Sequence, residues 1–164
     1  MKEQFKKFLN ECKSNDIKLV FVYTPEYIEG QKFIAGRKEL ISLYSKYSKQ
    51  FNIPFLAITG SNGKTTTKEI VNAIFSQQGN GLATQGNLNN EIGVPLTLFR
   101  LGEEHRYAVI EMGANHAGEI AYLTQLAHPK VAVITQCAPS HLEGFKTLDG
   151  VAHAKGEIFS GLSE

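Results

Sequence analysis

One stretch constrains the fold of this 164-residue chain more than any other: Ile53-Pro-Phe-Leu-Ala-Ile-Thr-Gly-Ser-Asn-Gly-Lys-Thr-Thr-Thr67. Its apolar beginning predicts a buried strand, which is followed by a glycine-flanked turn and a helix that begins near Lys64. Backbone N–H groups at the start of a helix point at bound anions, and glycine lets the main chain approach an anion closely. The stretch therefore predicts a polyphosphate site between a strand and a helix.

The residue types in this turn fit a polyphosphate. Lys64 would reach the β- and γ-phosphates, and the Thr65 hydroxyl would ligate Mg²⁺. The general phosphate-loop pattern has glycine six residues before the lysine, where this chain has Ile58, so only a shorter Gly-x-x-Gly-Lys-Thr pattern remains. Such turns also join strands to helices for steric reasons alone, but the position between a strand and a helix favours phosphate binding. The predicted cofactor-binding residues are Gly60, Ser61, Asn62, Gly63, Lys64, Thr65 and Thr66.

Composition excludes several classes of protein. The chain is 42% hydrophobic and 20% charged, as is usual for a globular protein, and its net charge of +1 argues against a broad nucleic-acid surface. Cys12 and Cys137 lie far apart, so we expect two reduced thiols and no metal-spaced pair. Neither a bilayer-spanning apolar run nor a signal peptide is present, so we expect a cytoplasmic protein without membrane insertion.

Apolar periodicity predicts strands that alternate with helices. The expected strands are 17–23, 53–58, 82–84, 106–112 and 131–135, and the expected helices are 2–13, 31–50, 64–77, one begun by Pro95, 117–127 and 148–162. Such alternation predicts an α/β fold with a mostly parallel sheet flanked by helices. The last predicted helix includes the stretch from Ala154 to Gly161, and the chain stops three residues after Gly161, which suggests a domain truncated at its C-terminal side.

Ligands of parallel α/β sheets lie beyond the carboxyl ends of the strands, so the residues there are the candidates for chemistry. Glu111 ends an otherwise apolar strand, where a carboxylate is costly to bury unless it is paired or bound to metal. Beside a phosphate loop, Mg²⁺ ligation is favoured over a partner lysine or helix start. His141 follows another strand and would lie near the same edge. His116 is expected to be a cap or surface residue, and His105, His128 and His153 to be structural or solvated.

The sequence leaves two interpretations open for Lys155, and two for the asparagines at positions 87, 89 and 90. Lys155 lies on the last predicted helix, where its residue type alone favours a solvated side chain. Asn87, Asn89 and Asn90 lie in a glycine-bounded stretch, where asparagine commonly forms turns. The same density of amides also suits hydrogen bonding to a sugar or a pyrophosphate.

Four ordered motifs resemble one family. Thr59-Gly-Ser-Asn-Gly-Lys-Thr-Thr-Thr-Lys-Glu69 resembles the ATP-binding signature of the Mur ligases. Further motifs are similar to that family: Gly86-Asn-Leu-Asn-Asn-Glu-Ile-Gly-Val-Pro95, Val109-Ile-Glu-Met-Gly-Ala-Asn-His-Ala-Gly-Glu-Ile120, and His141-Leu-Glu-Gly-Phe145 with Ala154-Lys-Gly-Glu-Ile-Phe159. They look most like the member that adds D-alanyl-D-alanine to UDP-N-acetylmuramoyl-tripeptide through an acyl phosphate. The resemblance covers residues 53–164 and implies a phosphate-loop-type central domain.

The resemblance implies roles for individual residues. Lys64 would stabilise the transferring phosphoryl group, and Thr65 and Glu111 would hold one Mg²⁺. His141 matches the ligand of a second Mg²⁺, and Lys155 matches a lysine that is carbamylated in several of these ligases, which would make it catalytic and metal-ligating. Residues Asn87, Asn89 and Asn90 match a loop near the UDP-sugar substrate.

The resemblance also implies an incomplete set of domains. Residues 1–50, a predicted helix-strand-helix, would be a remnant of the N-terminal substrate domain, and residues 51–164 would be the ATP-binding central domain. The C-terminal ligase domain would be a missing partner, so the chain alone is expected to be incomplete for turnover. Alternatives are another Mur-like ligase such as folylpolyglutamate synthase, or a non-catalytic nucleotide-binding module. A small-molecule kinase is a weaker alternative, because it leaves Glu111, His141 and Lys155 without a purpose.

Overall fold

The computed structural model describes Ser42 and residues 52–162. Its strands are β1 (Phe55–Thr59), β2 (Gly81–Ala83), β3 (Tyr107–Glu111) and β4 (Val131–Ile134). Its helices are α4 (Lys64–Phe75), α5 (Gly93–Leu98), α6 (Glu119–Ala127), α7 (Leu142–Phe145) and α8 (Leu148–Gly156), with 3₁₀ turns η1 (Ser76–Gln78) and η2 (Glu157–Gly161). The elements predicted over 2–13, 17–23 and 31–50 lie outside the described residues, apart from Ser42, which is helical.

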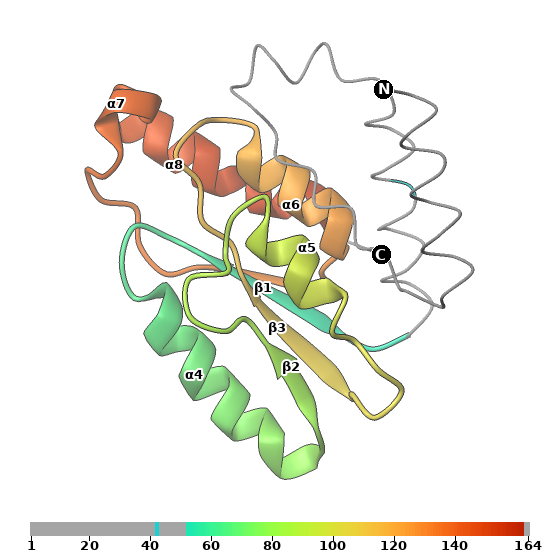
Figure 1. The fold of residues 1–164 in the computed structure, drawn as a ribbon. Helices are drawn as coiled ribbons and strands as arrows, with labels where there is room; N and C mark the ends of the chain where they lie inside the picture. Colours follow the sequence, from blue (N-terminus) through green and yellow to red (C-terminus); the bar gives the residue numbers. More distant parts are fainter. Residues whose placement is uncertain (1–41, 43–51, 163–164) are drawn as a thin grey trace, which may run out of the picture.

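The strands form one parallel sheet in the order β2-β3-β1-β4 (Figure 1). Strand β1 pairs with β3 on one side and with β4 on the other. The predicted α/β fold with a parallel sheet flanked by helices is confirmed. Because β1 is an interior strand, the loop at its carboxyl end is flanked by the segments that leave β3 and β4.

Both faces of the sheet are covered, as a parallel sheet requires. Phe55 and Ala57 of β1 point to the core formed with α5, α6 and α8, whereas Ile58 belongs to the smaller core beneath α4. Figure 1 shows α4 on one face and the other helices opposite. The near-continuous apolar character of β1 and β3 follows from burial on both faces.

Contacts distant in sequence hold two helices in place. Lys68 of α4 is 2% exposed, and its Nζ donates to the carbonyl oxygen of Thr84 at 2.7 Å. The carboxylate of Glu157 accepts from the backbone N–H groups of Gly118 at 2.7 Å and Ala121 at 3.1 Å, and thereby caps the start of α6. Helix starts favour such anions because their first N–H groups lack intrahelical partners.

All five described helices differ from the sequence prediction, α4 and α6 by only two residues at one end. Helix α5 begins at Gly93, two residues before Pro95, and the helix predicted over 148–162 tightens into η2 at Glu157. The four-residue helix α7 was not predicted. At its Gly144 a Cβ atom would lie 1.9 Å from the carbonyl oxygen of Asn115, so a tertiary contact shapes this turn.

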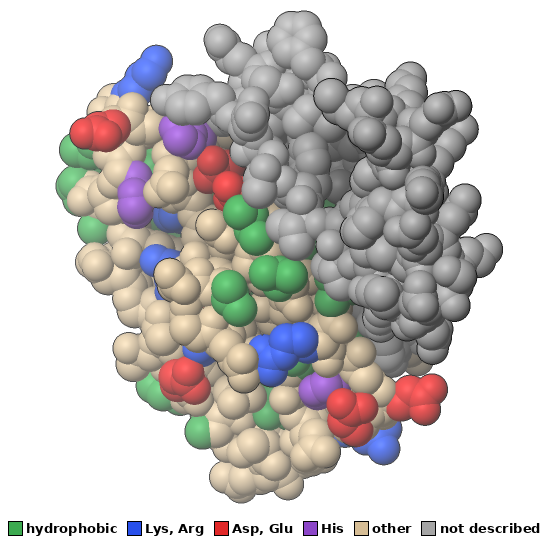
Figure 2. All heavy atoms as spheres, viewed as in Figure 1, with side chains coloured by type: hydrophobic (Ala, Val, Ile, Leu, Met, Phe, Trp, Pro, Cys, Tyr) green, Lys and Arg blue, Asp and Glu red, His purple; other side chains and the backbone are tan. Residues whose placement is uncertain are grey.

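The surface of the described residues carries no extended basic area on the face seen in Figure 2, where acidic and basic side chains are interspersed. Within residues 42 and 52–162, no helix has the length and apolar character needed to cross a membrane.

Candidate nucleotide-binding site

The turn between β1 and α4 presents unpaired N–H groups at the helix start. Gly60 and Gly63 have φ values of 145° and 77°, in the left-handed region that favours glycine. The first bond of the helix runs from the N–H of Thr67 to the carbonyl oxygen of Gly63 at 2.9 Å. The N–H groups of residues 64–66 come before Thr67, the first helical donor, so they are available to an anion such as phosphate.

Lys64 folds back over this turn. Its Nζ donates to the carbonyl oxygen of Gly60 at 2.8 Å and lies 3.5 Å from that of Ser61. The ammonium group is thus held at the turn by two neutral acceptors. A phosphate oxygen is a stronger acceptor for this cation, because charge-assisted hydrogen bonds exceed neutral ones in strength.

Glu111 faces the start of α4, as the sequence suggested. It is 2% exposed, and its Oε2 accepts from the Thr65 hydroxyl at 2.9 Å while its Oε1 accepts from Asn89 Nδ2 at 2.8 Å. Its backbone N–H donates to the hydroxyl of Thr84 at 2.9 Å, which fixes the end of β3. A buried carboxylate without a cationic partner in this contact set is suited to a metal ion.

The donor chemistry here fits Mg²⁺, which prefers hard oxygen ligands. Thr65 and Glu111 provide a hydroxyl and a carboxylate 2.9 Å apart. Among the described residues no group of three or more His, Cys, Asp or Glu side chains could hold a metal ion. A cation held by Thr65 and Glu111 would therefore take other ligands from phosphate oxygens and water, which is the usual arrangement for Mg²⁺.

The asparagines at positions 87, 89 and 90 differ in their contacts. Asn89 contacts Glu111, and its carbonyl oxygen accepts from the N–H of Gly113 at 2.7 Å. The side-chain oxygen of Asn90 accepts from the N–H of Gly93 at 2.9 Å, at the start of α5. Asn87 is exposed. Asn89 and Asn90 thus have structural partners within the protein, and contact of this loop with a substrate stays a prediction.

Lys155 is buried, so the solvated lysine expected from its residue type alone is wrong. The residue is 1% exposed, because this face of α8 packs into the core with Val151 and Ala154. Its Nζ lies 5.4 Å from the centre of the Phe145 ring. Burial lowers the pKa of Lys155 below its ordinary value, and the nearby charge of Lys64 lowers that pKa further.

His141 belongs to the same region. It precedes α7 in the left-handed conformation, with φ at 50°, and its side chain is exposed. Its ring stands edge-on to that of Phe145, with centroids 6.3 Å apart. The Phe145 ring is therefore near both His141 and the amine of Lys155, and the charge of Lys64 affects the pKa of Lys155.

Two of the remaining histidines, His116 and His105, have the structural roles that the sequence suggested. His116 lies 3.1 Å from Glu119 Oε1, just before α6, and His105 accepts from the N–H of Gly102 at 2.9 Å.

Sequence reasoning missed Thr84 and Phe145. Thr84 directly follows β2, so the rule that ligand sites lie at the carboxyl ends of strands would have selected it. Phe145 carried no such signal.

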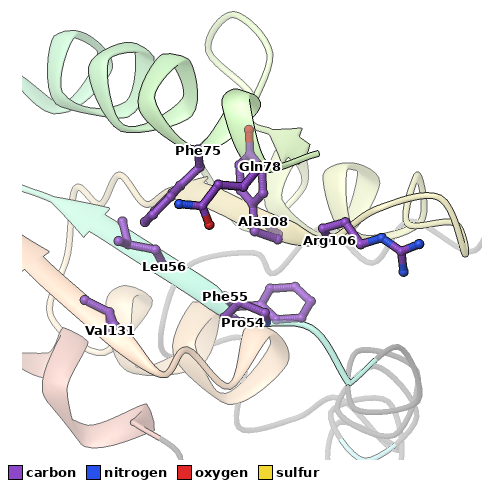
Figure 3. A pocket seen from close by; sticks show the side chains of 9 residues that line it. Pro54, Phe55, Leu56, Phe75, Gln78, Arg106, Ala108 and Val131 are labelled. Atoms are coloured by element: carbon purple, nitrogen blue, oxygen red, sulfur yellow. The ribbon is translucent and has the colours of Figure 1, made fainter. Parts of the chain in front are cut away.

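A cavity of about 190 Å³ lies at the opposite edge of the sheet (Figure 3). It opens beside the beginnings of β1, β3 and β4 and is lined mainly by apolar side chains, among them Leu56, Phe75 and Val131. This cavity has none of the polar groups gathered at the phosphate loop and is a separate feature.

Replacing Gly60 with alanine is expected to disrupt the phosphate loop. A Cβ atom there would lie 2.0 Å from the Thr135 hydroxyl oxygen, and φ is 145°. Strain and overpacking together predict a loss of about 2–4 kcal/mol in the free energy of unfolding, measurable by urea titration. Gly156→Ala is the matched control, since a Cβ there meets nothing within 4 Å and φ is −59°. Equal losses in the two variants would contradict this prediction.

Fold and site together define an α/β domain in which the glycine-bounded loop at the end of an interior strand has the geometry of a phosphate loop and faces a buried carboxylate. The chain matches the model of the Mur ligase middle domain over residues 58–164, and it belongs to the Mur ligase family. The resemblance seen in the four sequence motifs is thereby confirmed.

Curated relatives narrow the comparison. The UDP-N-acetylmuramoyl-tripeptide–D-alanyl-D-alanine ligase of Escherichia coli (strain K12) is 62% identical over 109 residues, which are 66% of this chain and 24% of the relative. The ligase of the same name from Bacillus subtilis (strain 168) is 42% identical over 76% of this chain and 27% of its own length. This chain thus spans about a quarter of the length of these relatives.

Solved structures agree. A crystal structure of MurF from Acinetobacter baumannii matches 77% of this chain and 28% of its own, with a TM-score of 0.73 and 44% identity. The MurF ligase of Thermotoga maritima in complex with ADP matches 79% of this chain and 30% of its own, with a TM-score of 0.71 and 34% identity.

Proposed function

We propose that this chain is the ATP-binding part of a ligase that adds D-alanyl-D-alanine to UDP-N-acetylmuramoyl-tripeptide, in peptidoglycan precursor synthesis in the cytoplasm. The names of the relatives support this assignment, and the related Thermotoga maritima structure contains ADP. The observation that carries the proposal is the 2.9 Å contact between Thr65, at the phosphate loop, and the buried carboxylate of Glu111. The rest of the ligase would supply the other substrate contacts.

In this reaction the carboxylate of the tripeptide substrate attacks the γ-phosphate of ATP, which gives an acyl phosphate and ADP. The amine of D-alanyl-D-alanine then attacks the acyl carbon and displaces phosphate. The N–H groups at the start of α4 and the ammonium group of Lys64 would bind and orient the phosphates, in the manner of other phosphoryl transfers. Thr65 and Glu111 would hold Mg²⁺, which supplies charge neutralisation at the phosphates when bound.

Lys155 and His141 are proposed for the second part of this site. A buried amine with a lowered pKa is neutral over a wider pH range, and a neutral amine adds to CO₂ to give a carbamate and a proton. The product is an anion able to ligate a cation, and His141 would be a second ligand nearby. A carbamate carbon resonance in samples equilibrated with ¹³C-bicarbonate, lost in Lys155→Met, tests the modification.

Isothermal titration calorimetry with a non-hydrolysable ATP analogue and Mg²⁺ tests nucleotide binding by this chain. We expect saturable binding that weakens when Mg²⁺ is chelated. Absence of binding at millimolar analogue, in a sample whose circular dichroism shows a folded protein, would refute nucleotide binding by this chain.

An ATPase assay separates a ligase part with residual turnover from a module that only binds nucleotide, since only the former hydrolyses ATP in a Lys64-dependent way.

The burial of Lys155 also predicts a pH dependence of stability in the absence of CO₂. Its pKa is lowered in the folded state, so the unfolded chain binds more protons between the lowered pKa and the ordinary value of 10.5. Stability is therefore expected to rise with pH through this window. Urea midpoints measured over this range should rise in the wild type and rise less in Lys155→Met, and parallel profiles for the two proteins would contradict the prediction.

A further inference from the structure

The phosphate loop is bonded along its length to the segment that follows β4. The N–H of Ser61 donates to the carbonyl oxygen of Gln136 at 2.8 Å. The hydroxyl of Thr135 donates to the carbonyl oxygen of Asn62, and the Asn62 side chain lies 3.3 Å from that of Gln136. Two loops that are distant in sequence therefore lie against each other at the carboxyl edge of the sheet.

The hydroxyl of Ser61 is at the centre of this contact. It donates to the carbonyl oxygen of Ala138 at 2.9 Å, and it accepts from the N–H of Ala138 at 3.1 Å and from the hydroxyl of Ser140 at 2.9 Å. A serine hydroxyl has one donor and two acceptor positions, so all three are used. Because the N–H of Ser61 is also bonded, neither group is free for a phosphate, although the sequence suggested cofactor binding by this residue.

The segment held by Ser61 continues directly into His141. Ser140 precedes it, and the backbone oxygen of His141 accepts from the N–H of Phe145 at 3.0 Å within α7. Phe145 in turn lies over the amine of Lys155. The bond between the two serine hydroxyls is thus a direct link between the loop that carries Lys64 and the loop that carries His141.

We propose that Ser61 and Ser140 are positioning residues, which fasten the loop of residues 135–140 to the phosphate loop and so set the place of His141 relative to the bound phosphates. The functional half of this inference rests on the proposed nucleotide binding. The fastening itself rests only on the contacts of the two hydroxyls.

The backbone N–H of residue 61 offers a direct measurement, because it donates across the contact to the carbonyl oxygen of Gln136 and side-chain substitutions leave it in place. A hydrogen-bonded amide exchanges its hydrogen with solvent when that bond opens. The exchange rate, corrected for the intrinsic rate of the residue, therefore reports local opening between the two loops. Loss of one hydrogen bond in Ser140→Ala is expected to raise this rate about twofold to tenfold. Ser61→Ala removes three bonds and should raise the rate further.

The double variant decides whether the two hydroxyls act together. Since the Ser140 bond ends on Ser61, Ser61→Ala already removes it, and the residue 61 amide of the double variant is expected to exchange no faster than that of Ser61→Ala alone. Ser76→Ala is the matched control, because the Ser76 hydroxyl donates to the carbonyl oxygen of Ala73 on the exposed surface. It should leave the rate unchanged. The thermal midpoint should be the same in Ser140→Ala and Ser76→Ala, which separates local opening from global destabilisation.

Three results would overturn the proposal: an unchanged exchange rate in Ser140→Ala, independent and multiplicative effects in the double variant, or a large loss of nucleotide affinity in Ser61→Ala with an unchanged exchange rate of the residue 61 amide. The last result would make Ser61 a phosphate ligand. If the wild type binds no nucleotide, the proposed function fails, and the amide exchange rates still decide whether the serines fasten the loops.

Discussion

Lys64→Ala is expected to weaken binding of the ATP analogue about tenfold to hundredfold, since hydrogen bonds to charged groups contribute about 1.5–3 kcal/mol. In the structure the Lys64 ammonium lies at the turn and donates to the carbonyl oxygen of Gly60 at 2.8 Å. Alanine removes the one side-chain cation described within the phosphate loop, residues 60–66, while the N–H groups at the start of α4 remain. Residual weak binding is therefore expected, measured by calorimetry in the presence of Mg²⁺.

Lys130→Ala is the matched control for this charge. Lys130 is exposed and lies just before β4, at the edge of the sheet away from the phosphate loop. The Lys130→Ala substitution removes the same charge from the protein. It should leave the affinity for the ATP analogue within about twofold, because exposed charges far from a ligand are screened by salt. An equal loss of affinity in the two variants would mean that Lys64 acts only through net charge, and it would contradict a phosphate contact.

Glu111→Gln is expected to abolish the strengthening of nucleotide binding by Mg²⁺. Glutamine has nearly the same shape, and it can accept from Asn89 and donate to the hydroxyl of Thr65, so the two contacts of the carboxylate survive. What is lost is the negative charge, and a nearby cation loses an attraction that corresponds to roughly tenfold to hundredfold in affinity. Affinity measured with a chelator should stay the same or rise, since the phosphates lose a repulsive neighbour.

The comparison of affinities with and without Mg²⁺ separates metal binding from folding. Glu104→Gln is the control, because the Glu104 side chain is 61% exposed and lies before β3, away from the phosphate loop. It should keep the full dependence on Mg²⁺. If Glu111→Gln also keeps that dependence, Glu111 does not hold the cation, and the metal assignment fails.

Much of the fold was predictable from local patterns. The strand over 53–58 and the helix from Lys64 appear in the structure as β1 and α4, and the carboxylate at the end of the next long apolar strand does face the loop between them. These predictions succeeded because an apolar run buried on both faces and a glycine turn before a helix are determined by neighbouring residues. The position of Glu111 followed from the rule that parallel strands end at one edge.

The predictions that depended on distant partners were less successful. Lysine is a residue type that is usually solvated at the surface, yet α8 packs Lys155 into the core beside Phe145. Nothing near Ser61 in the sequence indicates that its hydroxyl is bonded to residues almost eighty positions away. Asn89 reaches Glu111 only because the loop after β2 lies beside the end of β3.

The sequence by itself determined the parallel α/β fold of the described residues, the phosphate loop at the end of β1 and the membership of the Mur ligase family. Only the tertiary structure decided the partner of each polar side chain at that loop, and which lysine is buried. The physical reason is the distance along the sequence over which each effect acts. Periodicity and turn chemistry act over a few residues, whereas burial and hydrogen-bond partners depend on which strands become neighbours in the sheet.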